Sequence, residues 1–360
     1  MTTTTSTSDH DLDVAVIGGG QAGLAMAWHL RRLGLRFAVL DAGSEIGAAW
    51  RSRWDSLRLF TPARYDSLPG LPFPGPPDRY PTKDEVAGYL RDYVAAFDLP
   101  VRLDSRVTRL SREGDGHALV TERGTVRARQ VVVATGPFQS PRTPATGLDP
   151  VVTQLHSSSY RNPDGLPLGP VLVVGDGNSG RQIARELAAT RRVELATAGT
   201  AAVVPQRLLG RDLFWWLDRS GLLGAPATSR IGQRMRARGE LVVGTTDRML
   251  RDSGVTLRPR LTAADGTAAW FADGTRTEVD SVVWATGYRP DHSWIDVDGA
   301  LAYGLPAHER GVSPAPGLYF LGLPWQHTRG SALLGFVGSD SAHLAERIAT
   351  RHARTPAHAS

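Results

Sequence analysis

The stretch that decides the fold is "DVAVIGGGQAGLAMAWHL", which runs from Asp13 to Leu30. The apolar run Val14–Ile17 leads into three glycines, and apolar residues then recur with helical spacing from Ala22 to Leu33. This pattern predicts a strand, a tight turn and a helix, and the apolar segment Phe37–Leu40 predicts the next strand. Together the three segments form one βαβ unit with parallel strands.

A second copy of this arrangement follows in "PVLVVGDGNSGRQIARELA", from Pro170 to Ala188. Val171–Val174 and Val193–Thr197 predict two further strands, and Ser179–Ala189 predicts the helix between them. Continuous apolar strands that alternate with amphipathic helices are typical of parallel sheets covered on both faces. The expected fold class is therefore α/β, with two Rossmann-like dinucleotide-binding domains.

The first turn, from Gly18 to Gly23, has the pattern G-x-G-x-x-G between the strand and the helix. Gly18 allows the tight turn, Gly20 lets the backbone approach a pyrophosphate, and Gly23 lets the helix pack closely on the strand. The free N–H groups of a helix N-terminus favour the negative phosphates. Asp41 ends the next strand, at the interval expected of a carboxylate that binds an adenosine ribose. We therefore predict that this turn binds a dinucleotide.

The second turn repeats the pattern with Gly175, Gly177 and Gly180. The strand after it ends in "VELATAGT" without an acidic residue, which argues against a strict preference for NADH. No arginine stands there to hold the 2′-phosphate of NADPH, so Arg181 and Arg207 are the candidate substitutes and the choice of nucleotide stays open. Two dinucleotide sites in one chain indicate electron transfer between a tightly held FAD in the first domain and a diffusible NADPH or NADH in the second.

The composition narrows the function classes. The chain has 360 residues, enough for two domains, and no cysteine, which excludes a structural disulfide, a thiolate metal site and a dithiol redox mechanism. The net charge is +5, but Lys83 is the only lysine and the arginines are spread along the chain, so we expect no nucleic-acid partner. The histidines lack ligand spacing and no apolar run is long enough to span a bilayer, so we expect no metal, no membrane partner and a cytoplasmic location.

The longer motifs resemble the class B flavin-dependent monooxygenases, and most closely their short bacterial members. The motifs that carry this resemblance are "GGGQAGL" (18–24), "IGAAWRSRWDSLRLFTP" (46–62), "ATGPFQSP" (134–141), "HSSSYRNP" (156–163), "GDGNSG" (175–180), "ATGYRPD" (285–291) and "GLYFLGLPWQHTRGSALLGF" (317–336). They follow the family order over nearly the whole chain. The resemblance implies that NAD(P)H reduces FAD, that the flavin then binds O2 as a C4a-(hydro)peroxide, and that one oxygen atom passes to a small-molecule substrate.

The resemblance also implies roles for individual residues. The FAD adenosine and pyrophosphate would contact Gly18, Gly20, Gln21, Ala22, Gly23, Asp41 and Val107. The region toward the isoalloxazine would contain Trp50, Arg51, Leu59, Thr61, Ala134, Thr135, Gly136, Gln326 and Ser331. The nicotinamide nucleotide would contact Gly175, Gly177, Asn178, Ser179, Gly180, Thr286 and Gly287. Thr61 and Gln326 are the candidate catalytic residues.

The domain organisation expected from these motifs is discontinuous. Residues 12–155 and 289–354 would form the FAD-binding domain, residues 156–288 would form the inserted NAD(P)H-binding domain, and the tails 1–11 and 355–360 would be disordered. The segment Thr61–Thr82, rich in Pro and Gly, predicts an ordered loop before a helix over Lys83–Phe97. Short strands around Val107 and Val120 and the run Ala128–Gly136 predict a β-meander.

The chain departs from the family pattern at several positions, and these departures leave more than one function open. Only His156 and Tyr160 remain of the family fingerprint, and Tyr160 favours oxygenation of a sulfide or amine, with a ketone as a further option. The segment Leu59–Pro62 lacks the asparagine that supports the oxygen adduct in larger members, which motivates an NAD(P)H oxidase or reductase as the alternative. A flavin-binding sensor or assembly protein is the third reading. We expect the loops Asp66–Tyr80 and Arg207–Leu223 to line the substrate pocket, and the protein to form a homodimer.

Overall fold

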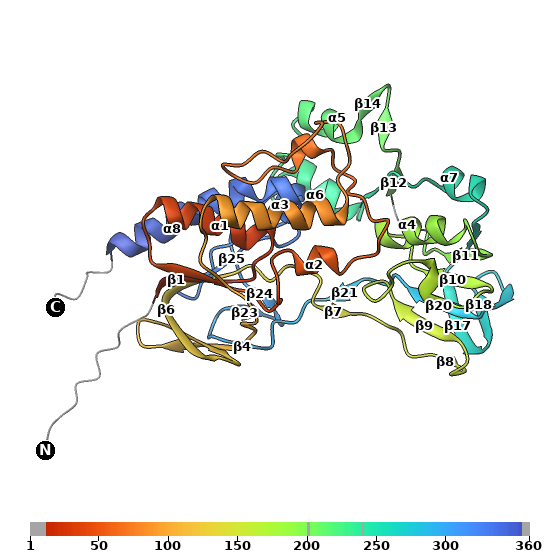
Figure 1. Cartoon of the computed structure of the whole chain (residues 1–360), viewed down its shortest axis with the longest axis horizontal. Helices are drawn as coiled ribbons and strands as arrows, with labels where there is room; N and C mark the ends of the chain where they lie inside the picture. The colour runs from red at the N-terminus through yellow and green to blue at the C-terminus, as the bar shows by residue number, and fades with distance from the viewer. Residues whose placement is uncertain (1–11, 200–201, 240, 355–360) are drawn as a thin grey trace, which may run out of the picture.

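The computed structural model describes residues 12–199, 202–239 and 241–354, so the two expected tails lie outside the described residues. Its core consists of two sheets, each with helices on its face, joined by extended segments (Figure 1). The chain builds most of the first sheet, then the second, and finally returns to the first. This is the expected α/β architecture with two Rossmann-like units, and the predicted fold class is confirmed.

The first sheet has eight strands in the order β22-β4-β5-β6-β1-β2-β3, with β25 also paired to β6. Its strands are β1 (Leu12–Ile17), β2 (Phe37–Leu40), β3 (Val101–Arg102), β4 (Val107–Glu113), β5 (Gly116–Thr121), β6 (Gly124–Val133), β22 (Ile295–Asp296) and β25 (Leu318–Phe320). β1 pairs in parallel with β2 and β6, whereas β4, β5 and β6 form the predicted antiparallel meander. All six residues of β1 are buried, because the central strand is covered on both faces.

Three long helices cover one face of this sheet: α1 (Gln21–Arg32), α3 (Lys83–Ala96) and α8 (Gly338–Arg354). Figure 1 shows them side by side in one layer, and the core between them and the sheet contains side chains such as Leu24, Tyr93 and Leu344. α3 begins with a capping box, in which the Thr82 hydroxyl accepts from the Glu85 N–H and the Glu85 carboxylate accepts from the Thr82 N–H. The cap explains why this helix begins where the Pro-rich loop ends.

The second sheet has five parallel strands in the order β16-β11-β10-β20-β9. They are β9 (Thr153–His156), β10 (Val171–Val174), β11 (Val193–Ala196), β16 (Thr256–Arg258) and β20 (Ser281–Trp284). Helices α4 (Asn178–Leu187) and α7 (Asp247–Asp252) pack on it. A smaller sheet packs through Phe271 and Ala269 against Trp284 and contains β8 (Gly147–Leu148), β17 (Leu261–Gly266), β18 (Ala268–Phe271) and β19 (Arg276–Glu278).

The remaining elements are short. They are α2 (Ala48–Arg51), β7 (Ser140–Pro141), β12 (Ala202–Val204), β13 (Arg207–Leu208), β14 (Arg211–Asp212), α5 (Leu213–Arg219), α6 (Arg230–Ala237), β15 (Leu241–Val243), β21 (Tyr288–Arg289), β23 (Leu301–Ala302) and β24 (Leu305–Pro306). Four 3-10 helices, η1 (Ala63–Tyr65), η2 (Pro163–Gly165), η3 (Arg329–Ala332) and η4 (Leu334–Phe336), complete the described chain. Within it, no helix is both long enough and apolar enough to span a bilayer.

The predicted element boundaries agree with the structure to within one or two residues at the two glycine turns. The expected domain break at residue 155 falls inside β9, which pairs with β20 of the second sheet. The polar sequence Thr153–His156 has no apolar run that would mark it as a strand. The two crossings between the sheets pair with each other as an antiparallel ribbon of β7 and β21. We therefore propose that the domains divide at this ribbon.

Candidate active site

The first glycine turn has the geometry of a phosphate cradle. Gly18 has φ +105°, and a Cβ added there would lie 2.5 Å from the Ala134 carbonyl oxygen. A Cβ at Gly23 would lie 1.8 Å from the Gly18 oxygen, so α1 packs directly on the turn. By contrast, a Cβ at Gly20 would meet nothing within 4 Å, so this side of the turn is open. The sequence-based roles of the three glycines agree with these distances.

The second turn has the same geometry. Gly175 has φ +110° with its Cβ position 2.3 Å from the Ala285 oxygen, and the Cβ position of Gly180 lies 1.8 Å from the Gly175 oxygen. Gly177 is open in the same way as Gly20. Asn178 is occupied elsewhere, because its side-chain oxygen accepts from the Val243 N–H at 2.9 Å. Its side-chain nitrogen donates to the Leu241 carbonyl at 3.4 Å, so both ends of the Asn178 amide are bound to β15.

Neither turn is closed by a side chain. No side chain caps the N-termini of α1 and α4, whereas α3, α5, α6 and α7 are capped by Thr82, Asp212, Ser229 and Thr246. A side-chain cap stabilises a helix by about 1 kcal/mol. The two helices that follow glycine turns lack this contribution, and their free N–H groups fit an anionic phosphate.

Asp41 lies beside the first turn, as predicted. Its Oδ2 accepts from the Gly19 N–H at 2.5 Å and its Oδ1 accepts from the Gly43 N–H at 2.7 Å. Each carboxylate oxygen keeps further lone pairs with which it can accept from a ribose diol. The Asp41 carbonyl also accepts from the Ser105 N–H, so the start of β4 with Val107 follows directly beside it. The structure thus brings Asp41 and the segment of Val107, the two predicted adenosine contacts, close together.

The two ATG motifs lie at the junction of the sheets. The Thr135 hydroxyl accepts from Gln139, and the Thr286 hydroxyl donates to the Arg142 carbonyl. Gly136 and Gly287 both have positive φ, and the Gly287 carbonyl contacts His156 Nε2 at 3.0 Å. Burial lowers the pKa of His156, so its ring is neutral at pH 7. The neutral ring connects the end of β9 with the second ATG motif through this hydrogen bond.

The same junction contains Arg53, which belongs to the motif at residues 46–62. Its guanidinium donates to the Tyr288 hydroxyl at 2.8 Å and lies over the rings of Phe138 and Tyr288, at 5.1 and 5.7 Å from their centroids. The neighbouring Arg51 forms an ion pair with Glu45 at 2.8 Å. Trp50 is half-buried and packs against both main cores. The segment of α2 therefore contacts both sides of the junction.

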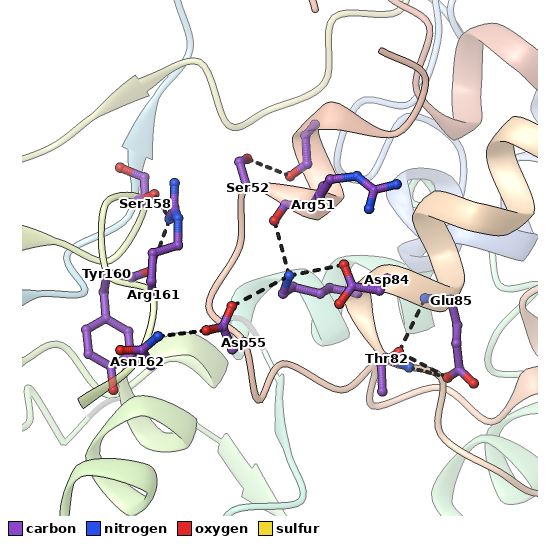
Figure 2. A network of polar contacts seen from close by, with 12 residues as sticks. Arg51, Ser52, Asp55, Thr82, Asp84, Glu85, Ser158, Tyr160, Arg161 and Asn162 are labelled. Atoms are coloured by element: carbon purple, nitrogen blue, oxygen red, sulfur yellow. Dashed lines mark hydrogen bonds and ion pairs between the residues drawn. The ribbon is translucent and has the colours of Figure 1, made fainter. Parts of the chain in front are cut away.

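Lys83, the only lysine, organises a second polar contact between the two units. Its buried ammonium donates to the Arg51 carbonyl at 3.2 Å and to Asp84 at 3.1 Å, and lies 3.7 Å from Asp55. Asp55 in turn accepts from the Asn162 side chain at 2.8 Å. Figure 2 shows Asp55 between the segment of Arg51 and Asp84 and the segment of Tyr160 to Asn162. The rarity of lysine in the chain was the one sequence signal for this contact.

Thr61 is buried, with 4% of its surface exposed, and its hydroxyl lies 2.6 Å from a carboxylate oxygen of Asp66. Leu59, two residues before it, is held by a backbone bond to Pro81. Burial raises the pKa of Asp66 to about 7, although the hydrogen bond from Thr61 opposes the shift. Asp66 has no motif around it, and the sequence offered no signal of its burial.

The loop that would close the flavin site is held by its own side chains. Ser331 Oγ accepts from the His327 and Thr328 N–H groups at 3.1 and 3.0 Å. Gln326 is buried; its Oε1 accepts from the Leu323 N–H at 3.3 Å, and its Nε2 lies against Gly311. The Gln326 oxygen therefore supports the loop from within, whereas its nitrogen is buried without a hydrogen-bond partner among the described residues.

The loops expected to line the pocket do meet. Tyr80 donates to Asp212 at 2.6 Å, and Gln206 donates to the Phe60 carbonyl at 2.7 Å. Phe214 of α5 stacks on the Phe60 ring at 5.9 Å. Tyr65 and Phe336 stack on each other at 6.1 Å and both contact Phe214. The result is an aromatic wall next to Thr61, built from both units.

The proposed substitute arginines differ in availability. Arg181 is 3% exposed, and its guanidinium donates to Asp247 at 2.7 Å and to backbone carbonyls of Asp176 and Thr245. These bonds would have to break before it could reach a 2′-phosphate, so Arg181 is not a suitable substitute. Arg207 is exposed on β13 and is the remaining candidate of the two. No group of three or more potential metal ligands occurs among the described residues.

Comparisons with known proteins agree with this geometry. A family model described as pyridine nucleotide-disulphide oxidoreductase matches residues 15–206. The Uncharacterized oxidoreductase CzcO-like of Geobacillus kaustophilus is 43% identical, over 94% of this chain and 99% of the relative. The Uncharacterized oxidoreductase CzcO of Bacillus subtilis is 39% identical, over 93% and 99%.

A solved structure, the flavin-containing monooxygenase from Stenotrophomonas maltophilia, is similar over 94% of this chain and 98% of its own, with a TM-score of 0.79 and 30% identity. The chain has no cysteine of its own for disulphide chemistry. The predicted resemblance, enzyme class and cofactors are thereby confirmed. The chain belongs to the pyridine nucleotide-disulphide oxidoreductase family and, within it, to the class B flavin monooxygenases, which use FAD and a nicotinamide dinucleotide.

Proposed function

We propose that this enzyme oxidises NAD(P)H and inserts one oxygen atom of O2 into a small substrate with a soft nucleophilic atom, a sulfide or an amine. Oxygenation of a ketone is the further option. The observation that carries the proposal is the pair of matching glycine turns, each open at its middle glycine and each followed by a helix without a side-chain cap. Two such cradles on two sheets fit two dinucleotides.

The residues around the first turn fit FAD. Gly18, Gly20 and the first N–H groups of α1 would bind its pyrophosphate, while Asp41 would accept from the ribose. Thr61 and the loop from Gln326 to Ser331 would lie toward the ring. When bound, FAD supplies the hydride acceptor and the activation of oxygen, and the protein contributes binding, orientation and exclusion of water.

The residues around the second turn fit the nicotinamide nucleotide. Gly175, Gly177, Ser179 and Gly180 would bind its pyrophosphate at the N-terminus of α4. The strand end carries no acid for a 2′-hydroxyl and Arg181 is held by Asp247, so both NADPH and NADH remain candidate donors. The intact second turn also disfavours a flavin-binding sensor, which needs no nicotinamide site.

A second candidate function is an NAD(P)H oxidase that releases hydrogen peroxide. It is favoured by one observation: the segment Leu59–Pro62 contains no side-chain amide. Without a donor from this segment, the flavin site would hold activated oxygen less well. The two functions differ in the fate of O2 and not in cofactor binding.

The test is to purify the FAD-loaded protein, add NADPH or NADH in air with thioethers, tertiary amines or cyclic ketones, and quantify product and peroxide together. We expect oxygenated thioether or amine, with the new oxygen derived from labelled O2. Stoichiometric peroxide without product across the panel would establish the oxidase instead. A protein purified without FAD, which cannot be loaded with it, would contradict both.

A further inference from the structure

A buried carboxyl group next to Thr61 has a role that the proposed function does not use. Asp66 follows η1 and is 1% exposed. Its Oδ1 lies 2.6 Å from Thr61 Oγ1, while its Oδ2 is buried without a hydrogen-bond partner among the residues described. An ionised carboxylate in such a site leaves lone pairs unsatisfied.

Among the described residues, no basic side chain lowers the pKa of Asp66; the one opposing contribution is the hydrogen bond from Thr61. Tyr89 of α3 is its titratable neighbour, and the Tyr89 hydroxyl is already engaged, accepting from the Leu68 N–H and donating to the Leu71 carbonyl, both at 2.7 Å. On the other side η4 packs closely on the backbone of this segment, because a Cβ at Gly335 would lie 2.0 Å from the Tyr65 carbonyl oxygen and 3.0 Å from the Asp66 carbonyl carbon. Burial accordingly raises the pKa of Asp66 to about 7, so both protonation states are accessible near neutral pH.

The segments around Thr61 and Asp66 place this pair next to the expected flavin site. Thr61 belongs to the segment expected to contact the flavin ring, and Asp66 packs on η4, which follows directly after the loop that ends at Ser331. Gln21, at the start of α1, donates to the Ala332 carbonyl in the same loop. The pair therefore lies between the two segments expected to contact the flavin.

We propose that Asp66 is a positioning residue that sets the direction of the Thr61 hydrogen bond. When Asp66 is protonated, its O–H donates to Thr61 Oγ1, and the Thr61 O–H is free to donate toward the flavin. When Asp66 is ionised, it accepts from Thr61, which then offers the flavin side only an acceptor. The proton is exchanged with solvent, and no other bond changes. The proposal rests on the proposed location of FAD, and it supplies a hydrogen-bond donor where Leu59–Pro62 has no amide.

The test compares the FAD-loaded wild type with four variants over a pH range of about 5 to 9. The variants are Asp66→Asn, Thr61→Val, Thr61→Ser and, as a control, Asp13→Asn, which alters another buried carboxylate at the far end of β1. The readouts are the visible spectrum and midpoint potential of bound FAD, and the infrared carbonyl band of a protonated carboxyl group. None of them requires turnover.

We expect the flavin spectrum and potential of the wild type, Thr61→Ser and Asp13→Asn to change with a midpoint near pH 7, together with loss of the carboxyl band. Asp66→Asn should lose both signals. Thr61→Val should lose the flavin signal and keep the carboxyl band, because the residue that transmits the change is absent. Titration of the flavin ring itself persists in every variant, so only differences from wild type count.

A flavin signal near pH 7 that persists in Asp66→Asn or in Thr61→Val would overturn the proposal, as would a carboxyl titration that the wild-type flavin does not sense. If Asp66→Asn fails to fold, the comparison of Thr61→Val with Thr61→Ser still tests the proposal, because only Thr61→Val should lose the flavin signal. Failure of the proposed function looks different: the protein would not bind FAD, or would release peroxide without product, whereas the carboxyl band still reports Asp66.

Discussion

At the scale of a single residue, Asp66 makes stability depend on pH in the opposite sense to an ordinary surface aspartate. Its pKa is about 7 in the folded protein and 3.8 ordinarily, so the folded state binds more protons between these values. The stabilising contribution of Asp66 to the free energy of unfolding is fully present below pH 3.8 and is lost as pH rises through about 7. A shift of this size corresponds to about 4 kcal/mol at most. The Tm of Asp66→Asn minus the Tm of the wild type should therefore be larger at pH 8 than at pH 5, as measured by calorimetry. An equal Tm difference at the two pH values would contradict this.

At the scale of an element, the two glycine turns can be tested with a matched pair of variants. Gly20→Ala and Gly177→Ala each add a methyl group that meets no protein atom within 4 Å, so the cofactor-free fold should keep its Tm. The methyl groups would displace a phosphate, and each charge-assisted bond lost costs about 1.5–3 kcal/mol, or roughly ten- to a hundredfold. We expect Gly20→Ala to lower FAD content, and Gly177→Ala to keep FAD but raise KM for NAD(P)H.

The control for this pair is Gly88→Ala in α3, where the added Cβ meets only Arg91 at 3.7 Å. It should leave FAD content and KM unchanged. If Gly177→Ala instead lowers FAD content and Gly20→Ala raises KM for NAD(P)H, the assignment of the two sites would be reversed. Loss of both cofactors in each variant would instead indicate that the turns unfold.

At the scale of the whole molecule, Arg53 connects the α2 segment with the ribbon of β7 and β21 through Tyr288 and Phe138. A hydrogen bond from a charged group contributes about 1.5–3 kcal/mol and a cation–π contact about 0.5–2 kcal/mol. Arg53→Met keeps the apolar stem and removes both. We expect unchanged FAD content and about tenfold slower reduction of the flavin by NADPH, measured by anaerobic stopped-flow, because the two units lose a fixed relative position.

Arg58→Met is the matched control, because Arg58 is exposed and, within the described part of the chain, its guanidinium has a single hydrogen bond, to the Tyr80 carbonyl. Its reduction rate should equal that of the wild type. An unchanged rate in Arg53→Met would show that the junction is held by the backbone ribbon without this side chain.

Prediction from the sequence succeeded where function depends on local chain geometry. Gly18, Gly23 and Asp41 act within one βαβ unit, so their spacing along the chain already determines their arrangement in space. The same holds for the second turn. Prediction was incomplete where a side chain has several possible partners: Asn178 bonds to Val243, Gln326 accepts from Leu323, and Arg181 pairs with Asp247. Nothing in the local sequence specifies those partners.

The sequence by itself determined that this chain forms two dinucleotide cradles, because strand, turn and helix are specified by residues a few positions apart. Only the tertiary structure decided which groups meet between the cradles: Arg53 with Tyr288, Asp55 with both Lys83 and Asn162, and Thr61 with Asp66. Except for Thr61 and Asp66, these contacts join segments far apart in the chain. Even for that pair, five positions apart, the burial that raises the pKa of Asp66 comes from α3 and η4, so it exists only once the whole molecule has packed.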